Sequence, residues 1–469
     1  MLAQQMNEAL GEIERIERQL DDVPPTVATR FHAAAQLVRA VGLAFQDDSL
    51  AALENALSIV RESGAGQDDH VISTLCRLGY WQLGKLEAFH ALPRHQSRAR
   101  WSRSHALSAM VDLSIEAAVA LDHLQVSTAK RLASDALAIA AATKAPPGLA
   151  AIPACLAAQL LYEEGHLDEA SAIVRDRLPA INAAGAVECA LRAYRLLARV
   201  ARLRGQYDHA AIVLREAAVL GERRGWPRLV AACALERISL LLDAGLTKEA
   251  RVSVETLDRY PGAHPTGFGH SRAEIMRYST LAHCRVSWAE APSREAAAAF
   301  RRLYHRTVDR RSLYAGCRLA VELAGMLASI GEIEEADALF FRAIKSGAGA
   351  GLHQIFLEKG GPLLQRAYDR AEAPGSADRG VLPLIGSLLS RWNARHAAGR
   401  PEGRISNVLT EREHVILGRI GQGMANKQIA RVLQISPETV KFHIKRIFLK
   451  LAVGKRAEAV SQAKSLGLL

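Results

Sequence analysis

One short pattern recurs through the first 340 residues of this chain and restricts the folds that it can adopt. In the four clearest copies a glycine is followed five residues later by an alanine, which opens a run of apolar residues. The alanines of all six copies are separated by 41, 41, 40, 40 and 86 residues, so the last interval holds two periods with one degenerate copy. A constant period of this length indicates stacked helical hairpins. The copies are GKLEA (84–88), LQVSTA (124–129), GHLDEA (165–170), GQYDHA (205–210), GLTKEA (245–250) and GEIEEA (331–336).

The pattern has a steric explanation. Glycine allows a helix to end and the chain to reverse, and the small alanine lets the two helices of a hairpin approach closely. Hydrophobic residues make up 49% of the chain and aromatic residues 5%, which is enough for a large core and favours helices over sheet. The pattern resembles tetratricopeptide repeats, with about six additional residues per hairpin. We therefore expect an all-α superhelical solenoid over residues 1–370.

The last part of the chain, residues 408–469, shows the pattern of a small helix-turn-helix domain. A capping box formed by Thr410 and Glu413 predicts the start of a first helix. We expect Asn426 to cap a second short helix and Ser436 to cap a third, with Pro437 at its first position. The residues expected on the inner sides of the first two helices are Val415, Leu417, Ile420, Ile429 and Leu433.

The third helix, expected over residues 437–451, divides its two faces by charge. An apolar stripe recurs at helical spacing on one face, and the opposite face is basic. Such a helix after a shorter helix and a tight turn is suited to insertion into the DNA major groove, although a solvated charged face is the alternative interpretation. The apolar residues are Val440, Ile444, Ile447 and Leu451, and the basic residues are Lys441, Lys445, Arg446 and Lys450.

Several short segments of this region together resemble the DNA-binding domain of LuxR-type transcription regulators. They match in order and without gaps over about sixty residues. The segments are Thr410/Glu413, Gly423, Asn426-Lys427, Ile429-Ala430, Ile435-Ser436, Thr439-Val440-Lys441, His443, Lys450-Leu451 and Arg456.

The resemblance implies roles for individual residues. It places Lys441, Phe442 and Lys445 at base edges, where Phe442 replaces a small aliphatic residue and would contact a thymine methyl group or the sugar edge. It also implies a four-helix domain whose last helix, residues 455–465, forms a dimer through Ala459, Val460 and Ala463. The remaining DNA-binding positions, of which the first three would lie against phosphates, are Lys427, Thr439, Arg446, Ser436, Lys450 and Arg456.

The distribution of charge supports a nucleic-acid contact at this end of the chain. Residues 404–469 contain twelve Lys and Arg and four Asp and Glu, which is +8 of the net charge of +11. The rest of the chain is nearly balanced, with 48 basic and 45 acidic residues. A basic excess confined to one segment favours a local DNA contact over diffuse binding to polyanions or membranes.

Motifs for catalysis, nucleotides or metals are absent from the sequence. It contains no P-loop and no GxSxG motif, so we expect neither an enzyme nor a cofactor. The six cysteines stand singly in apolar helical segments and are expected to be buried free thiols. His264 and His270 flank a Pro/Gly-rich loop, and we expect no metal site there. The loop is expected to be a connector, with part of a ligand site as the alternative.

The repeats also resemble the sensor region of MalT-like regulators, including the segments 355–368 and 381–395. Those regulators carry an ATPase domain ahead of the repeats, whereas this chain begins with repeat-like sequence, so we expect no ATP-driven switch. The N-terminus lacks the pattern of a secretory signal, and the longest apolar run, residues 149–161, is too short and interrupted for a membrane span.

These observations predict a cytoplasmic DNA-binding transcription regulator. A solenoid that senses a small molecule or a protein would be joined, through a short helix and polar linker over residues 371–407, to the helix-turn-helix domain. The expected partners are double-stranded DNA, a second copy of the chain and an effector on the solenoid, with RNA polymerase as a further candidate. The alternative is a protein-interaction scaffold with a helix-turn-helix that does not read DNA.

Overall fold

The structure is a computed structural model of the 469-residue chain, and every regular element among the residues that it describes is a helix. The predicted all-α fold is thereby confirmed. The described residues are 11–18, 24–63, 70–92, 102–259, 269–309, 312–397 without 375 and 377, and 409–469 without 410, 452, 466 and 467.

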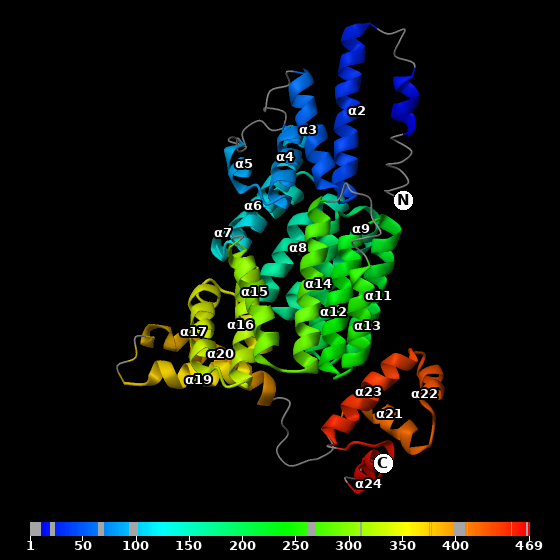
Figure 1. Ribbon diagram of the computed structural model, residues 1–469. Coiled ribbons are helices and arrows are strands. Elements are labelled where there is room, and N and C mark those ends of the chain that lie inside the picture. The colour runs from blue at the N-terminus through cyan, green and yellow to red at the C-terminus, as the bar shows by residue number, and fades with distance from the viewer. Residues whose placement is uncertain are drawn as a thin grey trace.

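Antiparallel helical hairpins form the body of the molecule and stand side by side in Figure 1. The N-terminal helices are α2 Pro25–Phe45, α3 Ser49–Ser63, α4 His70–Gln82 and α5 Leu86–Ala91. The hairpins of the array are α6 Arg103–Asp122 with α7 Val126–Ala142, α8 Pro147–Glu164 with α9 Leu167–Ala184, α10 Val187–Leu203 with α11 Tyr207–Arg224, α12 Pro227–Asp243 with α13 Thr247–Asp258, α14 Gly269–Glu290 with α15 Arg294–Asp309, and α16 Leu313–Ser329 with α17 Ile333–Ala343. After a turn of π-helix, η3 Ile344–Ala348, come α18 Gln354–Lys359, α19 Gly361–Glu372 and α20 Leu382–Ala397.

The repeated Gly-to-Ala pattern is the turn within each hairpin, as predicted. The five pattern glycines have positive φ angles of 65° to 93°, a conformation that costs glycine little because it has no Cβ. In the weaker copy at residues 124–129, Leu124 adopts the same conformation with φ of 59°. The alanines that follow are fully buried, with 0% of their surface exposed, at positions 129, 170, 210, 250 and 336.

The degenerate copy expected between Ala250 and Ala336 is the hairpin of α14 and α15. Its chain reversal falls at residues 291–293, and Ala297 near the start of α15 is buried like the pattern alanines. The Pro/Gly/His-rich loop that precedes this hairpin, residues 260–268, lies outside the described residues. The hairpin repeat therefore continues through the array, but the alanine-to-alanine intervals here are 47 and 39 residues.

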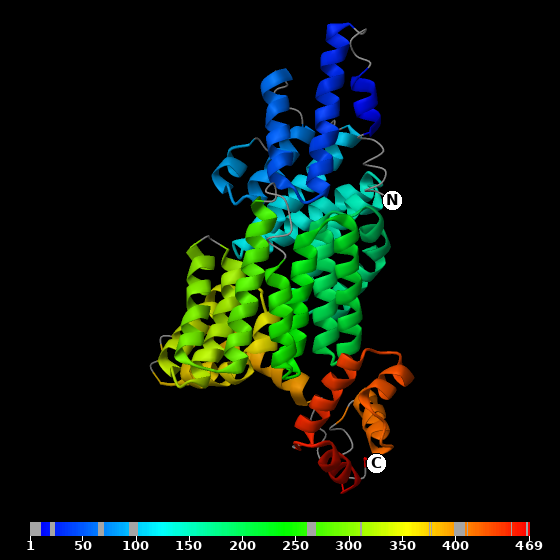
Figure 2. The same cartoon turned by 45° about the vertical axis from the view of Figure 1, so that its right-hand side comes forward.

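The array closes on itself, because its last hairpins pack against its first ones. Helix α16 contacts α6, and α18 contacts both α8 and α16. One continuous apolar cluster accordingly joins side chains of α6, α7 and α8 to those of α14 through α20. Helices α2 to α4 lie outside this closed body, at the top of Figures 1 and 2, and pack mainly on each other through a separate small core.

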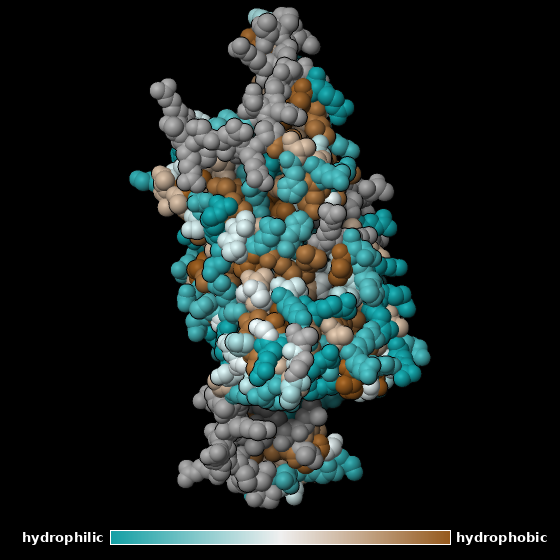
Figure 3. Space-filling model, turned by 90° about the vertical axis from the view of Figure 1, so that its left-hand side faces the viewer, coloured by the Kyte–Doolittle hydropathy of each residue, from teal (hydrophilic) through white to brown (hydrophobic). Residues whose placement is uncertain are grey.

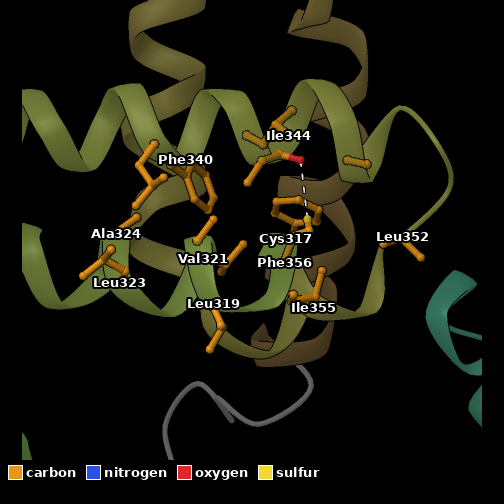
Figure 4. Packing of buried hydrophobic residues seen from close by; sticks show 14 of the residues in the cluster. Cys317, Leu319, Val321, Leu323, Ala324, Phe340, Ile344, Leu352, Ile355 and Phe356 are labelled. Atoms are coloured by element: carbon orange, nitrogen blue, oxygen red, sulfur yellow. Dashed lines mark hydrogen bonds between the residues drawn. The ribbon is translucent and has the colours of Figure 1, made fainter. Parts of the chain in front are cut away.

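The seam at the closing end is tightly packed around Cys317 on α16. Figure 4 shows its thiol pointing at the carbonyl oxygen of Ala343, to which it donates at 3.7 Å. The rings of Phe340 and Phe356 meet edge to face beside it, with centroids 5.8 Å apart. Burial raises the pKa of Cys317 to about 12, so the thiol stays neutral. All six cysteines are buried and free, which confirms the prediction.

One face of the array is mixed in polarity. On the face shown in Figure 3, hydrophilic side chains surround small hydrophobic areas. One described helix, α6, is long and apolar enough to cross a membrane by length and composition. Of its most apolar window 67% is buried, because α6 packs between α4, α7 and α8. That burial is the pattern of a core helix.

Candidate nucleic-acid interface

A four-helix unit follows the array at the bottom of Figure 1: α21 Glu411–Gly421, α22 Asn426–Leu433, α23 Pro437–Lys450 and α24 Arg456–Ser465. Its buried apolar side chains form a core of their own, which draws only on residues 409–468. The predicted inner stripe of the third helix, consisting of Val440, Ile444, Ile447 and Leu451, is buried in this core, although α23 ends one residue before Leu451. We therefore expect this unit to fold without the array.

Two local predictions for this unit were wrong in detail. Val415 is 44% exposed, and Ile416 is buried in its place, because α21 is rotated by one position relative to the predicted face. Asn426 is the first residue of α22 and not its cap, since the preceding Ala425 takes that position and its backbone N–H donates to Gln428 Oε1 at 2.8 Å. Thr410 of the predicted capping box lies outside the described residues.

The basic helix α23 lies against the array, below the lower ends of α11 to α13 in Figure 1. It covers the turns that join α10 to α11 and α12 to α13. Phe442 is only 6% exposed, because it packs on Ala244 and Leu246 of the second turn. Its ring also lies 4.9 Å from that of Tyr207, centroid to centroid. A residue expected at base edges is thus buried in a contact within the chain.

Polar groups surround this apolar contact. His443 Nε2 lies 2.9 Å from Asp208 Oδ2, and Nε2 carries the hydrogen because a carboxylate only accepts. Arg412 Nε lies 3.5 Å from the same oxygen. His443 Nδ1 and Asp208 Oδ1 are buried without a hydrogen-bond partner among the described residues. Such atoms cost about 1–3 kcal/mol each, which limits the net stability of the contact.

Two further basic residues of α23 are bound to the array. Lys445 Nζ donates to the backbone oxygen of Gly245. The Arg446 guanidinium lies over the ring of Tyr207, 4.0 Å from its centroid, and its Nε donates to Glu413 Oε1 at 3.3 Å. Phe442 and Arg446 are therefore covered by the array in this arrangement, whereas Lys445 is held by a hydrogen bond but remains exposed.

The other predicted DNA-binding residues are either exposed to solvent or bonded to other parts of the unit. Lys427 and Lys441 are exposed. Ser436 caps α23, as predicted, because its Oγ accepts from the backbone N–H of Thr439 at 3.1 Å. Arg456 has a role that the sequence did not indicate: it donates to Asn426 Oδ1 at 3.1 Å and to the backbone oxygen of Met424. The side chain of Lys450 lies outside the described residues.

Helix α24, the expected dimerisation element, shows less apolar surface than its sequence suggests. Ala459 and Ala463 are 0% exposed and belong to the core of the unit. Val460 is partly exposed, so it is the predicted contact residue that remains accessible to a second copy. Pairing through α24 stays a prediction.

The array residues that hold α23 were missed by the sequence analysis. Tyr207 and Asp208 lie in the GQYDHA copy of the pattern, and Ala244 and Leu246 flank the glycine of the GLTKEA copy. Tyr207 offered one signal, since it is the only aromatic residue within the six copies. No local rule, however, predicts which turns of a repeat array meet another unit.

A stripe of arginines on α10 was also missed, although its spacing of three and four residues is visible in the sequence. Arg195 and Arg199 reach Glu236 on α12 at 3.1 and 2.5 Å. Arg202 lies 3.5 Å from Glu358 on α18. Burial alone would raise the pKa of Glu236, but the charges of Arg199 and Arg195 hold it well below its usual range. These pairs connect inner helices of the closed array.

Comparisons with known proteins match the four-helix unit to a family and find relatives of the chain. Residues 407–463 match the model of the luxR family of bacterial regulatory proteins. The HTH-type transcriptional regulator MalT of Yersinia pestis (strain Pestoides F) is 44% identical over 66 residues, which are 14% of this chain and 7% of that protein. The nitrate/nitrite response regulator protein NarP of Escherichia coli (strain K12) is 53% identical over 128 residues, which are 27% of this chain and 54% of that protein. The chain thus spans a small part of its MalT relatives and about half of NarP.

Proposed function

Residues 407–463 form a helix-turn-helix domain of the luxR family, and on this premise we propose that the chain is a transcription regulator whose helical array controls DNA binding by that domain. In the DNA-bound form α23 lies in the major groove, with Lys441, Phe442 and Lys445 at base edges. Phosphate contacts through Lys427, Thr439 and Arg446 supply much of the affinity. No catalytic step and no cofactor is part of this function.

The contact between α23 and the array is the observation that carries the proposal. It occupies Phe442, Lys445 and Arg446 at once, so docking on the array and binding of DNA compete for the same face. A signal that weakens docking frees this face. Because a ligand shifts such a balance only through its preference for one state, a coupling of about 1–3 kcal/mol changes DNA affinity roughly 5–150-fold.

The proposed function also implies an effector, RNA polymerase and a second copy of the chain as partners. The effector, a small molecule or a protein, binds the array in the undocked state, and the regulator acts in the cytoplasm, where DNA and RNA polymerase are available. Two copies pair through α24 on DNA, with Val460 at the contact. Val460→Glu is expected to convert a two-copy footprint into that of a single copy, whereas Ser461→Glu, at an exposed neighbouring position, is the matched control.

The test of DNA reading uses residues 405–469 alone, since this unit has its own core. Fluorescence anisotropy with a binding-site duplex, selected from a random library, is expected to show that Lys445→Ala weakens specific binding by roughly 1–3 kcal/mol and relaxes one base preference. Lys427→Ala should weaken binding to all sequences equally and reduce the salt slope by about one unit. If the unmutated unit retained no DNA at low salt, the scaffold function would be favoured instead.

A further inference from the structure

A second site of interest uses none of the residues proposed to bind DNA. An open cavity of about 570 Å³ is lined by ionisable side chains from four parts of the chain: Lys130 of α7, Glu164 and His166 around the end of α8, His353 before α18 and Arg391 of α20. We propose that this cavity binds a small oxyanion, either the phosphate group or the carboxylates of a metabolite. The proposal names the effector class of the regulator proposed above and rests on that function for its regulatory consequence.

The cavity offers mainly hydrogen-bond donors. Arg391 Nη2 donates to the backbone oxygen of Glu164 at 2.8 Å, and Nη1 lies 2.9 Å from His353 Nδ1. Since arginine only donates, His353 Nδ1 accepts and its hydrogen is on Nε2. The one carboxylate of the lining, that of Glu164, is already paired with Lys130 at 2.8 Å. Donors in excess over acceptors are the requirement for recognising an oxyanion.

Positive charge at this site is incompletely compensated. Burial and then the neighbouring charge of Arg395 lower the pKa of Arg391, and burial and then Arg391 lower the pKa of His353. Arg395 donates through Nη2 to Gln354 at 3.3 Å, while its Nη1 is buried without a partner among the described residues. A bound anion would offset these unfavourable interactions, because opposite charge favours the ionised form of Arg391 and Arg395.

The backbone at the cavity is shaped to admit Arg391. Gly165, the turn glycine of the hairpin of α8 and α9, has a φ of 93° and lies so close to Arg391 that an added Cβ would collide with the guanidinium. The backbone N–H of His353 donates to the oxygen of Glu163 at 2.8 Å, which joins the segment before α18 to the end of α8. The cavity therefore lies at the seam where the array closes.

Its position connects the cavity to the DNA-binding unit. Arg391 belongs to α20, which ends at Ala397 and is the last described helix before α21. An anion that binds Arg391 therefore contacts the helix that precedes the helix-turn-helix unit in the chain. The site is thus placed to change the balance between docked and free α23.

Isothermal titration calorimetry on the full chain tests the site directly. The probes are inorganic phosphate, pyrophosphate and citrate, titrated at constant ionic strength, so that the phosphate and carboxylate arms are compared. We expect saturable binding of at least one probe, and an affinity about tenfold lower in Arg391→Gln, because a charge-assisted hydrogen bond is lost. Arg251→Gln is the matched control, since Arg251 is an ion-paired arginine on α13, outside the cavity.

The outcomes separate the site from the proposed function. Lys130→Gln, at an exposed side chain, gives a second loss-of-binding variant if Arg391→Gln does not fold. No saturable binding of any probe, or an equal loss in Arg251→Gln, would overturn the site. Anion binding that leaves the DNA affinity of the full chain unchanged would overturn its role as the effector site. Anion binding by a chain whose isolated residues 405–469 do not bind DNA would overturn the proposed function and leave the anion site standing.

Discussion

At the scale of single residues, Asp208 has the most direct bearing on control of DNA binding. It accepts from His443 and pairs with Arg412, both in the DNA-binding unit, although Asp208 itself lies in the array. Asp208→Ala removes both contacts and leaves buried polar groups unpaired, which costs about 1–3 kcal/mol. We expect the DNA affinity of the full chain to rise roughly 5–150-fold in an anisotropy titration.

A matched control for Asp208 is available one period earlier in the sequence. Asp168 occupies the same position in the GHLDEA copy and pairs with Arg204 of the array, not with the DNA-binding unit. Asp168→Ala is therefore expected to leave DNA affinity unchanged. Equal effects of the two substitutions would show that the docking seen here does not restrain DNA binding.

The raised pKa of Asp122 makes the free energy of unfolding depend on pH. Burial raises its pKa from an ordinary 3.8 to about 6, despite the nearby charges of Arg192 and Arg277. The folded state then binds more protons than the unfolded state between these values, so Asp122 lowers stability as pH rises through this window, by at most about 3 kcal/mol. Asp122→Asn should raise the melting temperature at pH 8 and change it little at pH 4. An equal shift at both pH values would contradict this assignment.

At the scale of secondary-structure elements, the ion pairs of α10 tie together helices that are distant in sequence. Glu236 is buried and receives two arginines of α10, so Glu236→Gln leaves them without their counter-charge. Disrupting a buried pair in this way destabilises a protein by about 3–5 kcal/mol. Urea unfolding followed by circular dichroism should show this loss.

The control for Glu236 is an ion pair at the surface. Glu290 of α14 pairs with Arg251 of α13, and both side chains are more than one third exposed. Solvent screens such pairs, so Glu290→Gln should leave the unfolding midpoint nearly unchanged. A comparable loss in both variants would mean that burial does not set the strength of the α10 pairs.

Most elements could be predicted from the sequence, because their causes are local. Pattern glycines such as Gly205 and Gly245 end helices through backbone conformation, and the stripe of Val440 and Ile444 marks an inner face. Val415 was misassigned because two adjacent apolar residues compete for one core position, and packing on neighbouring helices decides between them. The helix-turn-helix unit was recognisable because its spacing leaves few alternatives.

At the scale of the whole molecule, the arrangement of the parts was beyond prediction from the sequence. The docking of α23 depends on Phe442 meeting Leu246, residues almost two hundred positions apart, and no periodicity relates them. The cavity around Arg391 likewise exists only because the array closes and brings α20 to α8. Both features arise from contacts between distant segments, which hydrophobic periodicity does not report.

Closure of the array also changes how the protein should come apart. An open stack of hairpins loses its terminal repeats first, since each repeat is held only by its neighbours. Here α16 and α18 rest on α6 and α8, so no hairpin between them is terminal, and opening at any point must break two interfaces. Native-state hydrogen exchange should therefore find nearly equal protection from α6 to α18, with α2 to α4 exchanging earlier through their separate core. The closed array from α6 to α18 would then unfold as one cooperative unit, whereas α2 to α4 would open by local unfolding.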